Sequence, residues 1–334
     1  MSQLKEGKVS PFVLQKFFSS LPEDRSVIVG PGIGKDAAVV SIEENLIAIK
    51  TDPITFTSEN LGWYVVNINA NDIACMGAEP CWFLVNLILP PGEKKQFLQT
   101  FFDQLSQSCK ELGISLVGGH TEVTPAVKRP IAVGCMVGKL KVGKVVTNSD
   151  ARVGDVVLLT KGVAIEGTHV IYQEKKEDLK NKIPLEDIKK IENFLKDPGI
   201  SIVKEAKIAL KNFRVHCLHD PTEGGLIAGV WEIAKASKVG IVVEEKKVPI
   251  LRETKIICER FNIDPLALLA SGALLIVTEE KESEKLISLY KKEKIRCEKI
   301  GKVLPEKEGV IIVRRGGRKE NILEPPEDEL TKLF

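Results

Sequence analysis

The stretch Asn71-Asp72-Ile73-Ala74-Cys75-Met76-Gly77-Ala78-Glu79-Pro80 decides how this chain arranges its chemistry. Its first seven residues end a longer segment, residues 61–77. In that segment apolar residues recur with helical spacing among small ones, so we predict a helix there. Asn67 and Asn71 are four residues apart and share one helix face, with Asp72 beside them. A buried carboxylate without a partner is costly, so Asp72 requires one. Either a hydrogen bond inside the helix packing or a metal ion can supply it.

Further aspartates stand beside small residues or at strand ends on both sides of this stretch. Asp36 follows a glycine-rich run, Asp52 ends a predicted strand, and Asp220 lies in His219-Asp220-Pro221-Thr222. Isolated carboxylates of this kind add little packing, but gathered in one cleft they supply the hard oxygen ligands that magnesium prefers. The neighbouring glycines let backbone N–H groups approach a polyphosphate. The pattern therefore indicates a nucleotide enzyme.

The glycine-rich run is Gly30-Pro31-Gly32-Ile33-Gly34-Lys35-Asp36. It lacks the Gly-Lys-Ser/Thr ending of a P-loop and leads into a strand rather than a helix, which argues against a Walker-type site. Taken alone, the run is a glycine turn. Followed by Asp36 and Asp52, it becomes a candidate phosphate cover with Lys35 as its cation.

Two other segments carry candidate site residues. Gly118-Gly119-His120-Thr121-Glu122 follows a short apolar strand, residues 114–117, and so is expected to be a loop at a strand end. A lone histidine there is more often a structural hydrogen-bond partner, but Glu122 and a phosphate-donating Thr121 favour a site. In His219-Asp-Pro-Thr-Glu-Gly-Gly225 the proline stiffens a turn, and the helix that follows can hold an anion at its N-terminus. Alternatively, Asp220 or Thr222 simply caps that helix.

The rest of the pattern mixes hairpins with helices, which favours the α+β class over regular β-α alternation. A turn-rich stretch, residues 148–154, is the best boundary and divides the chain into domains 1–150 and 151–334. The last ~20 residues are polar and are expected to be flexible. We expect strands at residues 27–30, 37–42, 46–52, 81–89, 114–117, 131–140, 156–160, 215–218, 241–243, 274–278 and 310–313. We expect helices at 61–77, 97–112, 174–196, 200–210, 224–237 and 282–291.

Composition narrows the class of protein. The chain has 334 residues, enough for two domains, and its 48 basic and 46 acidic residues leave a net charge of +2. Such a balance of charges gives no strong positive potential that would attract nucleic acid. The longest apolar run, residues 82–89, is too short to span a membrane. Seven cysteines without a Cys-x-x-Cys pair and an N-terminus without a secretory signal indicate a soluble, cytoplasmic protein with reduced thiols.

In order along the chain, these segments resemble the aminoimidazole ribonucleotide synthetase (PurM-like) superfamily. That superfamily also contains thiamine-monophosphate kinase, selenophosphate synthetase and the hydrogenase maturation factor HypE. The resemblance covers nearly the whole chain and is specific for the superfamily, less so for the member. It runs through residues 36–39, 71–80, 118–122, 154–158, 219–225 and 264–265, and Gly301.

The resemblance implies a two-domain α+β architecture. Its N-terminal domain pairs across a homodimer into a β-barrel-like core, and its C-terminal domain covers a cleft that holds ATP and Mg²⁺. It implies metal ligands at Asp36, Asp52 and Asp72, phosphate contacts at Lys35, Gly118, Gly119 and Thr121, and an Asp220 that closes the site from the second domain. From the segments described above, we predict His120, Glu122 and Asp220 as catalytic residues. We also predict further cofactor contacts at Gly32, Gly34, Asn71 and Gly224. The shared chemistry is phosphorylation of an oxygen, often of a carbonyl or amide, which turns it into a leaving group.

Among the members, HypE is most similar, through residues 219–225, 239–241 and 264–266. HypE uses ATP to dehydrate a carbamoyl group on its C-terminal cysteine to a nitrile. Here no cysteine follows Cys297, so we expect a HypE-like protein that does not perform the terminal-thiol reaction in cis. Its acceptor is then a small molecule or a protein-borne group, with a maturation protein as a candidate partner. Glu166, His169 and Ser271 are candidates to line the acceptor pocket.

Two alternatives stay open. A thiamine-monophosphate kinase-like or other small-molecule kinase is one, although Lys35 stands where those sequences carry an aspartate. A nucleotide-binding maturation or scaffold subunit that acts through a partner is the other. Selenophosphate synthetase is disfavoured because no cysteine precedes the glycine-rich run.

Overall fold

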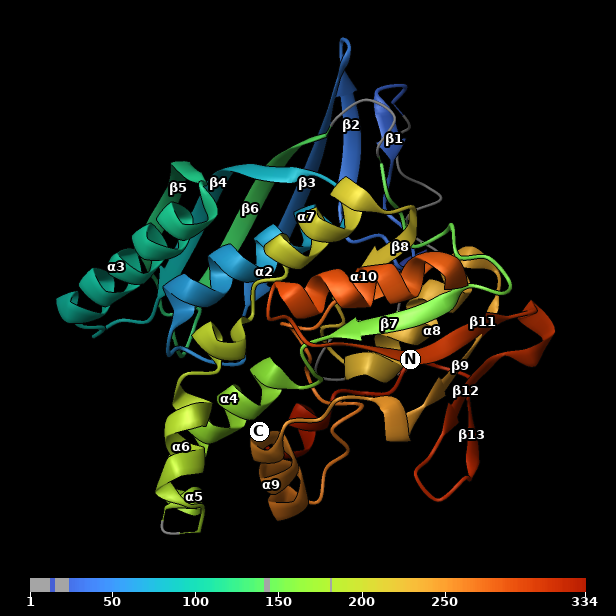
Figure 1. The fold of residues 1–334 in the computed structure, drawn as a ribbon. Helices are drawn as coiled ribbons and strands as arrows, with labels where there is room; N and C mark the ends of the chain where they lie inside the picture. The colour runs from blue at the N-terminus through green and yellow to red at the C-terminus, as the bar shows by residue number, and fades with distance from the viewer. Residues whose placement is uncertain (1–12, 16–23, 141–144, 181) are drawn as a thin grey trace. The chain divides into compact units, whose positions relative to one another are not determined.

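The computed structural model describes residues 13–15, 24–140, 145–180 and 182–334 (Figure 1). The chain divides into two compact units. The N-terminal unit comprises Asp24–Gly30 and Asp36–Val145, and the C-terminal unit contains Pro31–Lys35 and Val146–Phe334. The glycine segment, Pro31–Lys35, thus makes its contacts within the C-terminal unit. The domain boundary at residue 150 stays a prediction.

A six-stranded sheet forms the N-terminal unit, in the order β1-β2-β3-β6-β4-β5. Its strands are β1 Val27–Val29, β2 Ala38–Ile42, β3 Asn45–Ile54, β4 Glu79–Leu89, β5 Ser115–Val123 and β6 Ile131–Leu140. Only the β4–β5 pair is parallel, and the other neighbours are antiparallel. Two helices, α2 Leu61–Cys75 and α3 Lys95–Leu112, accompany this sheet (Figure 1).

Helix α2 lies directly on the backbone of β6. A Cβ atom at Gly134 would come within 2.4 Å of Asn69 Nδ2, and one at Gly138 within 2.3 Å of Ile73 Cγ2. The two glycines therefore let the helix approach closely, and every residue of α2 is buried. This explains why its sequence shows small and polar residues on all sides instead of an amphipathic pattern.

The opposite face of the sheet is apolar and open in the single chain. Ile49, Val137 and Trp82 are consecutive partners across β3, β6 and β4, so their side chains form one row. Ile49 and Trp82 are 36% and 37% exposed, and Leu84 in the next row is 38% exposed. Side chains alternate between the faces of a strand, so the buried Phe83 and Val85 point to the α2 side.

A seven-stranded sheet forms the C-terminal unit, in the order β13-β12-β9-β11-β7-β10-β8. Its strands are β7 Val156–Thr160, β8 Val215–His219, β9 Gly240–Glu244, β10 Leu275–Thr278, β11 Cys297–Leu304, β12 Val310–Val313 and β13 Lys319–Ile322. Only β9 and β12 pair in parallel. The helices are α4 Ile165–Glu174, α5 Lys176–Leu179, α6 Leu185–Glu192, α7 Val203–Asn212, α8 Gly225–Ser237, α9 Arg252–Phe261 and α10 Glu280–Lys292. Short helical turns are Leu195–Gly199, Glu245–Lys247, Glu306–Glu308 and Glu329–Lys332.

The end of the chain makes specific contacts within the C-terminal unit. Trp231 Nε1 donates to the Leu323 carbonyl at 3.1 Å, and the Glu329 amide donates to the Ala267 carbonyl at 3.2 Å. Leu330 is fully buried. The flexibility expected of these residues stays a prediction, but their polar composition gave no sign of such contacts.

Most predicted elements are present, and two predictions are wrong. The helix expected at 174–196 is interrupted, because α5 ends at Leu179 and α6 begins only at Leu185. Residues 114–117 are not a short buried strand that ends before a loop. Strand β5 continues to Val123 as the outermost strand of its sheet, and it is exposed along its whole length. The sequence interpretation also missed α4, α9, β11 and β13. Within the described residues, no helix combines the length and apolar character that a membrane span requires.

Candidate functional site

Two of the predicted metal ligands share one cation in the N-terminal unit. Lys50 Nζ lies 3.3 Å from Asp72 Oδ2 and 3.7 Å from Asp52 Oδ2. Asp52 pairs across the sheet with Gly134, which faces α2, so its carboxylate lies on the α2 side, where Asp72 is buried. The contact with Asp72 is an ion pair by distance and not an aligned hydrogen bond. Lys50 was not among the predicted site residues.

Asp36 approaches the same end of α2. It stands just before β2 and is buried, and its carboxylate oxygen lies within 4.8 Å of Cys75 Sγ. Cys75 follows Asp72 by three residues on α2, so the two share a helix face. Asp52 and Asp72 thus meet at Lys50, and Asp36 lies near Cys75, about one helical turn from Asp72. Their role as ligands stays a prediction.

The donor set fits a magnesium ion. Three carboxylates supply hard oxygen atoms, the ligand type that magnesium takes in proteins. The Lys50 ammonium shows that two of these carboxylates already gather around a positive charge. Grouped carboxylates repel one another unless a cation neutralises them, and Lys50 does so here.

Two buried asparagines lie next to this acidic group. Asn71, a predicted cofactor contact, is fully buried on α2. Asn69 Nδ2 donates to the Val65 carbonyl at 2.8 Å and to the Asp52 carbonyl at 3.3 Å. Within the described part of the chain, Asn69 Oδ1 has no hydrogen-bond partner. Sequence reasoning missed Asn69, because its position opposite Gly134 depends on how α2 packs on β6.

The predicted residues on β5 divide between the two faces of the sheet. A Cβ at Gly119 would lie 2.0 Å from the Val85 carbonyl oxygen, so the approach of β4 requires glycine there. Gly119 pairs with Val85 on the α2 side, and Thr121 shares that side. His120 and Glu122 point to the open face, where His120 Nε2 lies 3.2 Å from Glu122 Oε2. Within one chain, this pair therefore does not join the carboxylates on the α2 side.

In the C-terminal unit, specific contacts hold the glycine segment in place. Lys35 Nζ donates to Ser149 Oγ at 2.9 Å. Gly34 has a φ of +66°, and a Cβ there would lie 3.1 Å from the Glu232 carbonyl oxygen of α8. Gly32 has more room, its nearest neighbour being the Lys35 side chain. This segment was expected to be a glycine turn or a phosphate cover, and its anchoring contacts were not predicted.

The start of α8 is occupied by the end of the chain. Gly224 is the N-cap residue in a left-handed conformation, and no side chain caps the helix, so capping by Asp220 or Thr222 is not observed. The Gly224 amide donates to Asp328 Oδ2 at 2.7 Å. Burial raises the pKa of Asp328 to about 6. Asp220 is buried directly after β8. The predicted cofactor contact of Gly224 thus involves an amide that already has an internal acceptor.

The three acceptor-pocket candidates are all buried. Burial, with a smaller contribution from Lys176, lowers the pKa of His169 to about 4. His169 Nε2 lies 3.2 Å from Gln173 Nε2. Among the described residues, Ser271 Oγ has no hydrogen-bond partner. Glu166 lies in the first turn of α4. Their role in acceptor binding stays a prediction.

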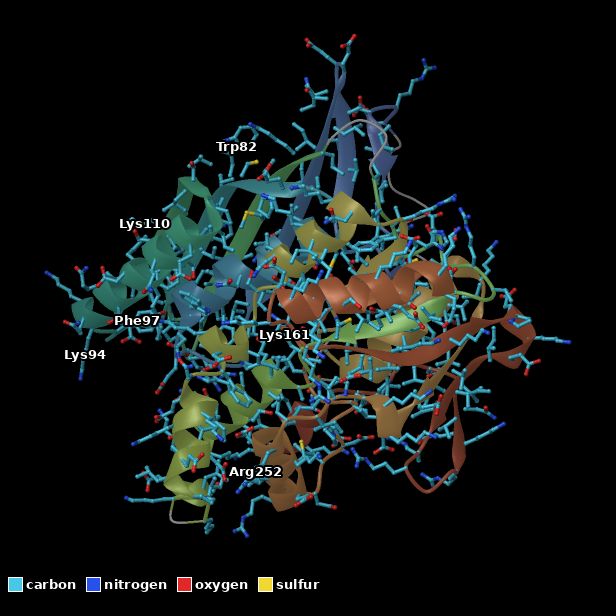
Figure 2. All side chains as sticks on the ribbon, in the orientation of Figure 1. Trp82, Lys94, Phe97, Lys110, Lys161 and Arg252 are labelled. Atoms are coloured by element: carbon cyan, nitrogen blue, oxygen red, sulfur yellow. The ribbon has the colours of Figure 1, made fainter. Side chains whose placement is uncertain are left out.

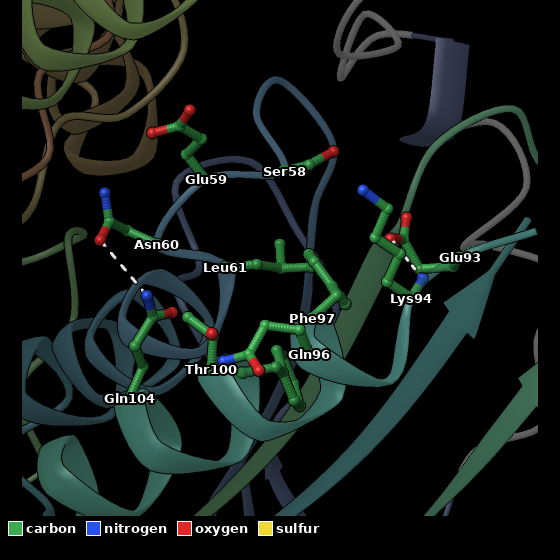
Figure 3. A pocket seen from close by; sticks show the side chains of 11 residues that line it. Ser58, Glu59, Asn60, Leu61, Glu93, Lys94, Gln96, Phe97, Thr100 and Gln104 are labelled. Carbon is green, nitrogen blue, oxygen red and sulfur yellow. Dashed lines mark hydrogen bonds between the residues drawn. The ribbon is translucent and has the colours of Figure 1, made fainter.

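A cavity of about 350 Å³ opens where the N-terminal ends of α2 and α3 meet (Figure 3). Leu61 and Phe97 form apolar parts of its lining, and Lys94 and Gln104 are among its polar residues. Gln104 Nε2 donates to Asn60 Oδ1 at 3.4 Å. None of the predicted site residues lines this cavity. Asp72 lies near the other end of α2, about 16 Å away at 1.5 Å per residue.

Comparison with known proteins matches both parts of the chain to family models. The N-terminal domain of AIR synthase related protein matches residues 34–140, and the C-terminal domain of the same family matches residues 152–314. The "Putative hydrogenase expression/formation protein" of Methanocaldococcus jannaschii is 25% identical over 94% of this chain and 93% of its own length. The carbamoyl dehydratase HypE of Rhizobium leguminosarum is 25% identical over 76% and 72%. The thiamine-monophosphate kinase of Buchnera aphidicola is 27% identical over 90% and 93%.

Solved structures share the fold. A HypE–HypF complex contains a chain with a TM-score of 0.76 and 24% identity, covering 94% of this chain and 99% of that chain. HypE in complex with ATP gives a TM-score of 0.71 and 22% identity, covering 97% of each chain. These likenesses confirm the predicted two-domain α+β architecture.

Proposed function

Because the chain belongs to the AIR synthase related protein family, we propose that it is a HypE-like, ATP-dependent enzyme that phosphorylates a carbonyl, amide or carbamoyl oxygen. The observation that carries this proposal is the pair of carboxylates, Asp52 and Asp72, around Lys50, with Asp36 near Cys75 of the same helix. Relatives named as a carbamoyl dehydratase and as a thiamine-monophosphate kinase support an ATP-dependent reaction.

The reaction needs charge neutralisation more than covalent help from the protein. Magnesium, when bound, neutralises the triphosphate and orients its terminal group. Asp36, Asp52 and Asp72 would hold the ion, and Lys50 would then leave their carboxylates or turn toward a phosphate. Lys35 would supply a second positive charge for the phosphates. The acceptor oxygen attacks the γ-phosphorus as the bond to ADP breaks, and the phosphorylated oxygen can later depart as phosphate.

Calorimetric titration of the protein with ATP, with and without magnesium, tests this proposal. We expect magnesium-dependent binding that Asp72→Asn weakens at least about tenfold, because the variant removes a charged ligand. Asp103→Asn is the matched control, since Asp103 is exposed on α3 and bonds only to Gln99 within the described residues. Folded protein that binds no ATP would reject the proposal. Equal affinity in the Asp72 variant would remove that residue from the ligands.

We also infer that the enzyme is a cytoplasmic homodimer. The open apolar face of the N-terminal sheet, with Ile49, Trp82 and Leu84, supports a second copy as its cover (Trp82 is labelled in Figure 2). His120 and Glu122 lie on that same face, so a second copy would determine their surroundings. The seven free cysteines support a reducing compartment.

The identity of the phosphate acceptor distinguishes the two remaining hypotheses about function. A thiamine-monophosphate kinase-like activity is favoured by the relative that covers 90% of this chain, and it predicts ADP release on addition of thiamine monophosphate. A protein-borne acceptor is favoured by the neighbour solved as a HypE–HypF complex. In that case ATP turnover should rise only on addition of a carbamoyltransferase-like partner. Assay of ADP formation with each addition separates the two.

A further inference from the structure

The backbone of the glycine segment, Pro31–Lys35, approaches α8 closely at Gly34. A Cβ at Gly34 would lie 3.1 Å from the Glu232 carbonyl oxygen and 3.3 Å from Ala236 Cβ. The positive φ of Gly34 and this close approach both favour glycine. Polar side chains nearby add hydrogen bonds to this segment.

Asn148 supplies the main polar anchor. Its Nδ2 donates to the Gly34 carbonyl at 2.7 Å, and the residue is 1% exposed. Ser237 Oγ of α8 donates to the Asn148 carbonyl at 2.7 Å, which fixes the asparagine backbone. The side-chain amide cannot be reversed, because its oxygen would then face the Gly34 carbonyl oxygen.

His219 holds Asn148 from the other side. The imidazole Nδ1 lies 3.1 Å from Asn148 Nδ2, and an amide nitrogen only donates, so Nδ1 is an acceptor. The ring proton is therefore on Nε2, which donates to Glu232 Oε2 at 2.8 Å. A continuous chain of hydrogen bonds thus runs from Glu232 through His219 and Asn148 to the backbone of Gly34.

We propose that Asn148 and His219 are positioning residues that hold the glycine segment in place and so fix Lys35 for the nucleotide phosphates. Lys35 is next to Gly34, and its ammonium bonds to Ser149, the residue after Asn148. His219 is also next to Asp220, so one imidazole is linked to two predicted site segments. The anchoring itself follows from the contacts above, whereas its effect on phosphate binding rests on the proposed function.

Asn148→Asp is the sharpest test, because it keeps the shape of the side chain and removes the N–H donor. Without nucleotide, we expect about tenfold faster hydrogen exchange at residues 32–35 and about tenfold faster tryptic cleavage after Lys35. With ATP, we expect KM to rise about tenfold and kcat to change less. Asn212→Asp is the matched control, since Asn212 is exposed at the end of α7 and bonds to the Ile208 carbonyl. It should behave as the unchanged protein.

Two variants of His219 separate positioning from general stability. In His219→Asn the side-chain oxygen can stand where Nδ1 accepts from Asn148, so the segment should stay protected. In His219→Gln the longer side chain reaches toward Glu232 instead, and protection should be lost. These variants also keep the test open if Asn148→Asp does not fold.

The outcomes are distinct. Unchanged exchange and cleavage in folded Asn148→Asp and His219→Gln would overturn the anchoring. Faster exchange with an unchanged KM for ATP would overturn the positioning role. Faster exchange in a protein that binds no ATP in any form would support the anchoring and reject the proposed function alone.

Discussion

At the scale of single residues, the acidic group shows what the sequence could and could not predict. Asp36, Asp52 and Asp72 were recognisable because each stands beside small residues or at a strand end, where a carboxylate has no packing role. Lys50 was not, because a lysine in an exposed-looking hairpin strand is common. Its role depends on β3 pairing with β6, which places Lys50 on the face toward α2.

His169 should make the protein less stable in acid. Its pKa is lowered from 6.5 to about 4 by burial, so the unfolded chain binds a proton more readily than the native state. The stability that depends on a neutral His169 is therefore complete above about pH 6.5 and is lost as pH falls toward 4. At pH 5 the loss should be about 2 kcal/mol relative to pH 7.

Urea unfolding of His169→Gln at several pH values checks this expectation. The variant should lose less stability than the unchanged protein between pH 7 and pH 5. Asn212→Gln is the control, because Asn212 is exposed at the end of α7, and it should leave the pH dependence unchanged. Parallel pH profiles for the unchanged protein and His169→Gln would contradict the assignment.

At the scale of elements, prediction succeeded where a periodic apolar pattern was clear and failed where the pattern was absent or was misread. The amphipathic pattern of α3 and the hairpin of β2 and β3 were read from spacing alone. Helix α4 was missed because its first eight residues are all buried, so no polar face marks a helical period. Strand β5 was mistaken for a strand followed by a loop because its two glycines resemble a turn. The structure shows that Gly119 is there for the close approach of β4.

The contact of the chain end with α8 carries a pH dependence of opposite sign. Burial raises the pKa of Asp328 from 3.8 to about 6, so the native state binds a proton more readily than the unfolded chain. Stability from this residue is therefore highest in acid and declines as pH rises from about 4 to about 6. Asp328→Asn should gain about 2 kcal/mol relative to the unchanged protein between pH 4 and pH 7.

Chemical unfolding across that range measures the difference. Glu324→Gln, an exposed change in the same tail, is the control. Its unfolding free energy should differ from that of the unchanged protein by the same amount at every pH. A constant offset for Asp328→Asn as well would show that Asp328 has the same pKa in the folded and unfolded chain.

At the scale of the whole molecule, the open face of the N-terminal sheet leads to a prediction about assembly. Leu84→Asp places a charge on that face, where a second copy would have to bury it. We expect light scattering to show a dimer for the unchanged protein at micromolar concentration. The dimer dissociation constant of the Leu84→Asp variant should be at least about 100-fold higher.

Leu185→Asp is the control for this experiment, because Leu185 is 67% exposed on α6 in the other unit and should leave the dimer intact. A monomeric unchanged protein would contradict the proposal. So would a Leu84→Asp variant that dissociates no more readily than its parent.

The outermost position of β5 has a consequence for handling the protein. A nine-residue strand that is paired on one side presents a row of unused amide and carbonyl groups, which can recruit a strand from another molecule. The exposed side chains of Trp82, Leu84 and Val123 would add apolar contacts to any such association. Single copies of the chain should therefore form filaments or precipitate more readily than the dimer that we propose.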